Sequence, residues 1–147
     1  MAPPINVMTN PADEIRMPGD TPGGMGNCGV VAIATFTGKP YQMVESWIRH
    51  HCRKPGNWKG STRYSDQKAA LRVFNRKRSA AFNVKRRMTL KTWVSREMQP
   101  GVTYMIWTTA HLQVVRDGFV TDQSGTWPIS QYWGKGKAVR GGIARKS

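Results

Sequence analysis

The chain has 147 residues, of which 39% are hydrophobic and 10% aromatic, enough for one compact domain with one core and too few for two. The long uncharged stretch at residues 21–38 is broken by Pro22 and several glycines, which excludes a membrane span or a signal-peptide core there. With 23 Lys and Arg against 8 Asp and Glu, the formal charge of +15 indicates an acidic partner, such as nucleic acid, a ribosome or another polyanion, without specifying which.

The cysteines and histidines indicate the cellular compartment and whether a metal site is expected. Two cysteines allow one disulfide at most, so we expect a cytoplasmic protein, or a virion-associated one if it is viral, with no membrane partner. The run His50, His51 and Cys52 contains metal-ligand types, but adjacent helical residues point in different directions and no second ligand cluster follows. We therefore expect no metal and no cofactor.

The N-terminal part is predicted to hold an extended segment and three helices. Five prolines in residues 1–26 favour a turn-rich lead-in. Asn27 is a candidate helix cap, and Cys28 is then the first residue of a helix that runs to about Thr37, where "TGKP" stops it. Apolar residues at helical spacing predict further helices over 41–52 and about 65–76.

The remaining segments are mostly predicted strands. The stretch "AFNVKRR" (81–87) is typical of a strand, "TLKTWVSREM" (89–98) of a helix capped by Thr89, and residues 101–109, 111–122 and 137–142 of strands. Helices followed by a mostly antiparallel sheet predict an α+β fold. We expect the domain to span residues 27–133, with a mobile basic tail rich in Gly and Lys over 134–147.

The pair Asp117-Gly118 predicts a two-residue hairpin turn and so fixes a register. In that register Arg116 lies opposite Phe119, and His111 and Asp122 become diagonal neighbours on one face. Diagonal pairs lie roughly 7–8 Å apart at the backbone, within reach of a hydrogen bond between imidazole and carboxylate. The spacing therefore predicts an acid that orients the histidine.

Cys28 is either a buried small residue or a nucleophile. A thiol has an ordinary pKa of about 8.5, and both a helix N-terminus and a nearby imidazolium lower it. A cysteine, a histidine that acts as base and an acid that orients it form a set for nucleophilic catalysis, and the free backbone N–H of Cys28 is a candidate oxyanion donor.

The same segments resemble a known family. "NCGVVAIATFTGKPYQMVESWIRH" is similar to the nucleophile helix and following helix of papain-like cysteine peptidases, in the version found in bacteriocin-processing (double-glycine leader) peptidases. "YMIWTTAHLQVVRDGFVTDQSG" is similar to that family's strand pair with its catalytic histidine and acid. The resemblance implies a papain-like fold, Cys28 as nucleophile, His111 as general base and acid, Asp122 as orienting acid, and a peptide or protein substrate cleaved at a peptide or isopeptide bond.

One family feature is missing. These peptidases usually carry a glutamine shortly before the cysteine that completes the oxyanion hole, and "GDTPGGMGN" has none. Asn27 or Asn10 is the candidate substitute. The absence leaves open a second interpretation, a non-catalytic basic protein that keeps the papain-like fold and binds a polyanion.

A basic run supports that second interpretation. Residues 72–91 contain eight basic residues and no acid. Such a run is usually a solvated face, but basic residues four apart on a helix repel one another, and a polyanion would relieve the repulsion. The candidate binding residues are Arg72, Arg76, Lys77, Arg78, Lys85, Arg86 and Arg87.

Overall fold

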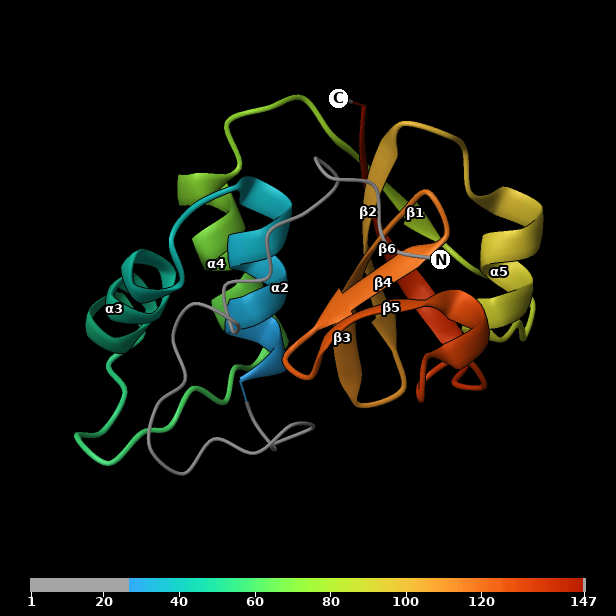
Figure 1. Ribbon diagram of the computed structural model, residues 1–147. Helices are drawn as coiled ribbons and strands as arrows, with labels where there is room; N and C mark the ends of the chain where they lie inside the picture. Colours follow the sequence, from blue (N-terminus) through green and yellow to red (C-terminus); the bar gives the residue numbers. More distant parts are fainter. Residues whose placement is uncertain (1–26, 147) are drawn as a thin grey trace.

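The computed structural model describes residues 27–146, which form four α-helices and a six-stranded antiparallel sheet (Figure 1). The helices are α2 (Cys28–Thr37), α3 (Tyr41–His51), α4 (Tyr64–Phe74) and α5 (Leu90–Glu97). The strands are β1 (Ala80–Asn83), β2 (Val102–Thr108), β3 (His111–Arg116), β4 (Phe119–Asp122), β5 (Gly125–Pro128) and β6 (Val139–Lys146), with a 3₁₀ turn, η1 (Ile129–Gln131), after β5. Their order across the sheet is β1-β6-β2-β3-β4-β5. The predicted α+β class is confirmed.

The helices begin and end near the predicted positions, but one predicted cap is wrong. The side chain of Asn27 makes no capping hydrogen bond to α2, whereas Thr89 caps α5 by accepting from the backbone N–H of Thr92. Gly38 ends α2 in the left-handed region at φ 72°, a conformation that glycine adopts without steric cost. Within residues 27–146 no helix is long and apolar enough to cross a bilayer.

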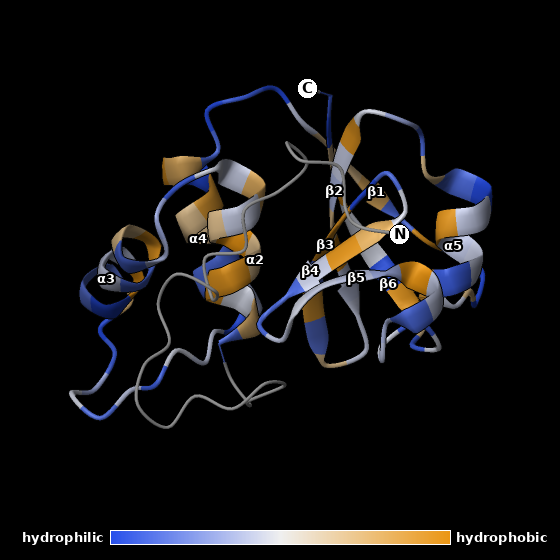
Figure 2. Cartoon of the chain, in the orientation of Figure 1, coloured by the Kyte–Doolittle hydropathy of each residue, from blue (hydrophilic) through white to orange (hydrophobic). Residues whose placement is uncertain are grey.

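The sheet separates two apolar clusters because successive side chains of a strand point to opposite faces. Met105, Leu112 and Val114 pack with α2, α3 and α4, while Tyr104 and Ile106 pack with α5. In Figures 1 and 2 the three helices α2–α4 lie on one side of the sheet and α5 on the other, with hydrophobic positions gathered toward the strands. Both faces of β2 and β3 are therefore buried.

The Asp-Gly hairpin has the predicted register. Arg116 pairs with Phe119 and Val115 with Val120, and both turn residues have positive φ, 49° at Asp117 and 82° at Gly118. Positive φ at both central positions is the requirement of a type I′ turn, which matches the natural twist of the strands it joins. The register that brings His111 toward Asp122 is confirmed.

The strand predicted over 137–142 is present as the first part of β6, and the predicted mobile tail is wrong from Val139 onward. Residues 139–146 form β6, which pairs with β1 on one side and β2 on the other, in the interior of the sheet. Gly142 permits this, because a Cβ there would lie 2.7 Å from the Phe82 ring and 2.5 Å from the carbonyl oxygen of Met105. The predicted strand 81–87 is also shorter: β1 ends at Asn83, and the basic residues 85–87 lie in the following loop.

Candidate active site

Cys28 is the first residue of α2, and the turn that it begins is held tightly by the segment before α4. A Cβ on Gly29 would lie 2.0 Å from Thr62 Oγ1 and 3.0 Å from Gln67 Nε2, so only glycine fits there. Gln67 donates to Thr62 at 3.0 Å and accepts from the indole of Trp107 at 2.7 Å. These contacts fix the N-terminus of α2 against α4 and β2.

His111 and Asp122 are close together, as the hairpin register requires. His111 is the first residue of β3 and Asp122 the last of β4, and His111 Nε2 lies 3.2 Å from Asp122 Oδ2. Asp122 is fully buried and His111 is 7% exposed. A buried carboxylate in this position fixes the orientation of the ring and stabilises its charged form.

Asp122 is surrounded by hydrogen-bond donors. Its Oδ1 accepts from the backbone N–H of Ser124 at 2.8 Å and from the Ser124 hydroxyl, and its Oδ2 accepts from the Tyr132 hydroxyl at 2.8 Å and the Trp133 indole at 2.9 Å. Burial raises the pKa of Asp122, but the hydrogen bonds from His111, Ser124 and Tyr132 outweigh it and hold the pKa below its ordinary value. Asp122 is therefore ionised at neutral pH.

Tyr132 connects the imidazole to the acid by a second route. Its hydroxyl lies 2.9 Å from His111 Nε2 and 2.8 Å from Asp122 Oδ2, both shorter than the direct contact of 3.2 Å. Burial and the Asp122 charge raise the pKa of Tyr132, so the phenol keeps its proton and can donate it to the carboxylate while it accepts from the ring. His111 Nε2 thus faces two acceptors.

The Cys28 thiol and the His111 ring are close enough to shift each other's pKa. Burial raises the pKa of the Cys28 thiol, but the neighbouring His111 ring and its positive charge, with the backbone N–H groups of Leu112 and Gly29, lower it below its ordinary value. Burial lowers the pKa of His111, but the hydrogen bond to Asp122 and the neighbouring Cys28 raise it overall. Both shifts favour a thiolate paired with an imidazolium. Since Nε2 faces Asp122 and Tyr132, the ring nitrogen left for the sulfur is Nδ1.

The structure thus brings together the three residues predicted as catalytic and leaves the oxyanion candidates less defined. Asn27 is half-buried beside Cys28, with its Cβ 3.0 Å from where a Cβ on Gly60 would lie. Asn10 lies outside the described residues. The backbone N–H groups in the first turn of α2 point toward the sulfur side of the site, as they do at any helix N-terminus.

Three further residues of the site were missed by sequence reasoning. Gln113 is fully buried and its Oε1 lies 3.3 Å from the Tyr132 hydroxyl, and Trp133 covers His111 with ring centroids 4.8 Å apart. Gln113 could have been found, because it is two residues after His111 and so shares its face of the strand. Tyr132 and Trp133 follow η1, where no regular pattern in the sequence indicates an orientation.

The second cysteine lies in a different environment. Cys52 follows α3, and burial together with the charge of Asp66 raises its thiol pKa. Neighbouring His51 is stacked on Trp47, with ring centroids 4.5 Å apart, and its Nδ1 lies 3.0 Å from the carbonyl oxygen of Trp47. Among residues 27–146 no group of three or more His, Cys, Asp and Glu side chains is placed to hold a metal ion.

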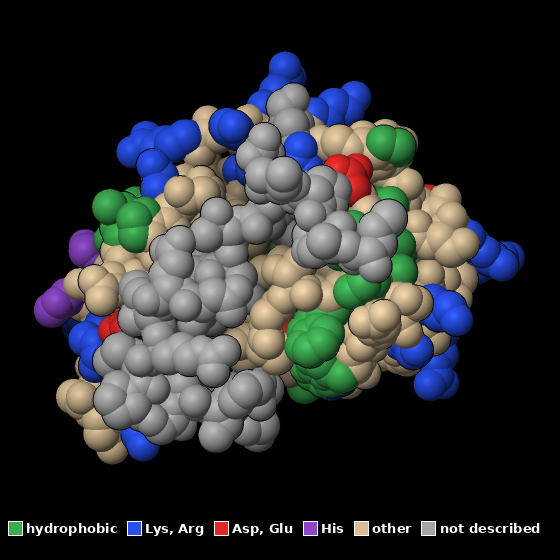
Figure 3. Space-filling model, in the orientation of Figure 1, with side chains coloured by type: hydrophobic (Ala, Val, Ile, Leu, Met, Phe, Trp, Pro, Cys, Tyr) green, Lys and Arg blue, Asp and Glu red, His purple; other side chains and the backbone are tan. Residues whose placement is uncertain are grey.

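The predicted polyanion-binding residues are all exposed, and all but Arg72 lie close to one end or the other of β1. Arg72 is on α4, three of the others precede β1 and three follow it: Arg76, Lys77, Arg78, Lys85, Arg86 and Arg87. On the face drawn in Figure 3, Lys and Arg side chains gather toward the outer margins of the molecule. The basic residues are thus arranged around an edge of the sheet, separate from Cys28.

Comparison of the chain with protein-family models, with curated proteins and with solved structures finds no match.

Proposed function

We propose that this protein is a thiol-dependent hydrolase of peptide or isopeptide bonds, with a papain-like arrangement of Cys28, His111 and Asp122. The observation that carries the proposal is the connected set itself. A thiol at a helix N-terminus, with its pKa lowered by His111, lies beside an imidazole of raised pKa, which in turn contacts a buried, ionised carboxylate at 3.2 Å. A structural cysteine needs none of these neighbours.

The chemistry follows from the protonation states. The Cys28 thiolate attacks the carbonyl carbon and forms a C–S bond, and the carbonyl electrons move to oxygen, where the backbone N–H of Cys28 is the expected donor. As the C–N bond breaks, the His111 imidazolium gives its proton to the departing amine. Neutral His111 then takes a proton from water, the hydroxide attacks the thioester, and the Cys28 thiolate leaves while the acid product is released.

Asp122 and Tyr132 act on the ring rather than on the substrate. The Asp122 charge stabilises the imidazolium before attack, and the two acceptors at Nε2 hold the ring so that Nδ1 faces the sulfur. Trp133 donates to Asp122 and covers one side of the ring, which limits access of water to the buried charge pair. In this scheme Asp122 and Tyr132 are positioning residues.

The test is cleavage of a complex peptide mixture, because the substrate sequence is unidentified. A proteome-derived peptide library is incubated with the protein, and new N-termini are identified by mass spectrometry. Wild type and Cys52→Ser should give the same set of new N-termini, whereas Cys28→Ser and His111→Ala should give none. If wild type and Cys28→Ser give indistinguishable products under reducing conditions from pH 5 to 8, the hydrolase proposal fails.

A further inference from the structure

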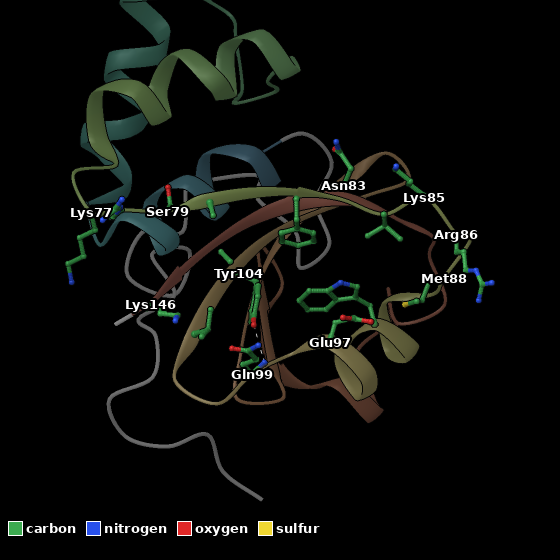
Figure 4. A pocket seen from close by; sticks show the side chains of 17 residues that line it. Lys77, Ser79, Asn83, Lys85, Arg86, Met88, Glu97, Gln99, Tyr104 and Lys146 are labelled. Carbon is green, nitrogen blue, oxygen red and sulfur yellow. Dashed lines mark hydrogen bonds between the residues drawn. The ribbon is translucent and has the colours of Figure 1, made fainter.

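A large groove lies on the α5 face of the sheet, beside β1, away from the candidate active site. Its volume is about 1040 Å³, at the upper end of the range for ligand pockets. The floor is apolar and includes Phe82, Val84, Met88, Trp93 and Tyr104. The rim is basic and includes Lys77, Arg78, Lys85, Arg86 and Lys146, with Glu97 as its acidic member. In Figure 4, Lys77 lies at one end of the groove and Lys85 and Arg86 at the other.

The strand beside this groove is an edge of the sheet. β1 pairs with β6, and within residues 27–146 no strand pairs with its other side. The backbone N–H of Val84 donates to Arg140 in β6, so by the alternation of an antiparallel ladder the N–H and C=O groups of Ala81 and Asn83 point outward. Ala81 and Asn83 are exposed. In the described part of the chain these outward groups have no strand partner, so one more strand can pair there.

A second hollow lies along the same strand on the opposite face of the sheet. It has a volume of about 470 Å³ and is lined by Ala81, Asn83 and Trp107 together with the basic residues Lys68 and Arg140. A strand added at β1 would direct successive side chains alternately to the two faces. One set would enter the groove with the apolar floor, and the other would face Lys68 and Arg140.

We infer that β1 binds an extended acidic segment of a partner protein by strand addition, with alternate apolar side chains in the groove and acidic ones against the basic residues. This mode obtains affinity from backbone hydrogen bonds and specificity from pockets for alternate side chains. The inference is independent of the thiol chemistry proposed above.

Two other roles for this edge fit less well. A single-stranded nucleic acid would stack its bases on exposed aromatic faces, but Trp93 is 3% exposed and is stacked on Phe82, with ring centroids 5.5 Å apart, and the Tyr104 hydroxyl already accepts from the backbone of Gln99. A short edge strand flanked by lysines also prevents self-association. That protective role does not require a hollow on each face of the strand.

The test uses a fluorescein-labelled decapeptide with Asp at each end and alternating Leu and Glu between them, measured by fluorescence anisotropy at low salt. Two further peptides carry N-methyl groups on the backbone nitrogens of every second residue, on the Leu positions in one and on the Glu positions in the other. Strand addition predicts that only one of the two loses at least about tenfold in affinity, since each backbone hydrogen bond contributes about 1 kcal/mol. Both N-methylated peptides keep the charge of the parent peptide.

Variants of the protein locate the site. Ala81→Pro removes one outward N–H, a position where an edge strand accepts proline, and should weaken binding at least about fivefold. Lys85→Glu with Arg86→Glu should weaken it at least about tenfold. The control variant, Arg53→Glu with Lys59→Glu, makes the same change in net charge at exposed positions between α3 and α4. It should weaken peptide binding by less than about threefold, because those positions are far from the groove and their charges are screened.

The outcomes separate the alternatives. The inference is overturned if the decapeptide shows no binding at a concentration of about 1 mM, which corresponds to a binding free energy of only about −4 kcal/mol. It is also overturned if both N-methylated peptides bind as tightly as the parent peptide. It is also overturned if a labelled oligothymidylate of equal charge binds more tightly than the peptide and competes with it, which would assign the basic rim to nucleic acid. Since the N-methylated peptides leave the protein unchanged, failure of Ala81→Pro to fold would not affect the decision.

Discussion

The replacement Asp122→Asn tests whether the buried acid organises the candidate site. Because the pKa of Asp122 is held below its ordinary value, the folded surroundings stabilise the charge more than water does, so removing the charge must cost stability. The amide can keep an oxygen at the Oδ2 position, where three donors converge, only by placing its NH₂ against the backbone N–H of Ser124.

The size of the stability loss follows from the number of hydrogen-bond donors to Asp122. Three hydrogen bonds to Oδ2 change from a charged to a neutral acceptor, and at about 0.5–1.5 kcal/mol each the loss is about 1.5–4.5 kcal/mol in the free energy of unfolding. The backbone N–H of Ser124 left without an acceptor adds about 1 kcal/mol or more. We therefore expect Asp122→Asn to lose at least about 2 kcal/mol, a large part of the stability of a domain this size.

Urea unfolding at pH 7, followed by tryptophan fluorescence, measures this loss. Asp117→Asn is the control, because Asn-Gly also favours the type I′ turn and the amide oxygen can still accept the one backbone donor, the N–H of Gly101 at 2.9 Å. With one such hydrogen bond in place of three, it should lose no more than about 1.5 kcal/mol, less than Asp122→Asn. Since the folded pKa of Asp122 is lowered, its contribution is present above the unfolded pKa and disappears as the pH falls through the folded value. The difference between wild type and Asp122→Asn should therefore persist at pH 5 and vanish in strong acid. Equal stability of the two at pH 7 would refute the reasoning.

Three other predictions concern reactivity and packing. Iodoacetamide should label Cys28 faster than Cys52 at pH 6–7, because the pKa of the Cys28 thiol is lowered and that of the Cys52 thiol is raised. Mass spectrometry of each site measures the two labelling rates, and equal rates would indicate that Cys28 is a structural thiol. Tyr132→Phe should slow the labelling of Cys28 by about threefold to tenfold, through one lost hydrogen bond to the ring and one to its acid, while an unchanged rate would remove Tyr132 from the positioning scheme. Gly29→Ala should lower the free energy of unfolding by about 1–3 kcal/mol by overpacking, whereas Gly56→Ala, with open space around it, should not; equal effects in urea unfolding would contradict the packing argument.

Local signals predicted the parts of the fold that depend on neighbouring residues. The Asp117-Gly118 turn fixes its own geometry, so the register that joins His111 to Asp122 could be predicted from a few residues. Thr89 is likewise a cap because its hydroxyl reaches a backbone N–H three residues away. The residues that form the candidate site are thus close to signals that act over short range.

Longer-range features could not be predicted in the same way. The strand predicted over 137–142 overlaps the start of β6, but its continuation to Lys146 and its interior place in the sheet were not predicted, because they depend on hydrogen bonds from neighbouring strands on both sides. No local pattern indicates β5 or the contact of Tyr132 with the buried Asp122. Both depend on tertiary contacts rather than on propensity.

The interior position of β6 has a consequence for how the molecule assembles. β6 follows every other described strand along the chain, yet it lies between β1 and β2, so β1 has no place in the sheet until β6 has docked on β2. Strands that are distant in sequence pair slowly, because the entropy cost of closing the loop between them comes before the stabilising contacts form. We therefore expect the β2–β3–β4–β5 meander to form early and β1 to join last and detach first. Amide hydrogen exchange should be fastest, among the strands, in β1.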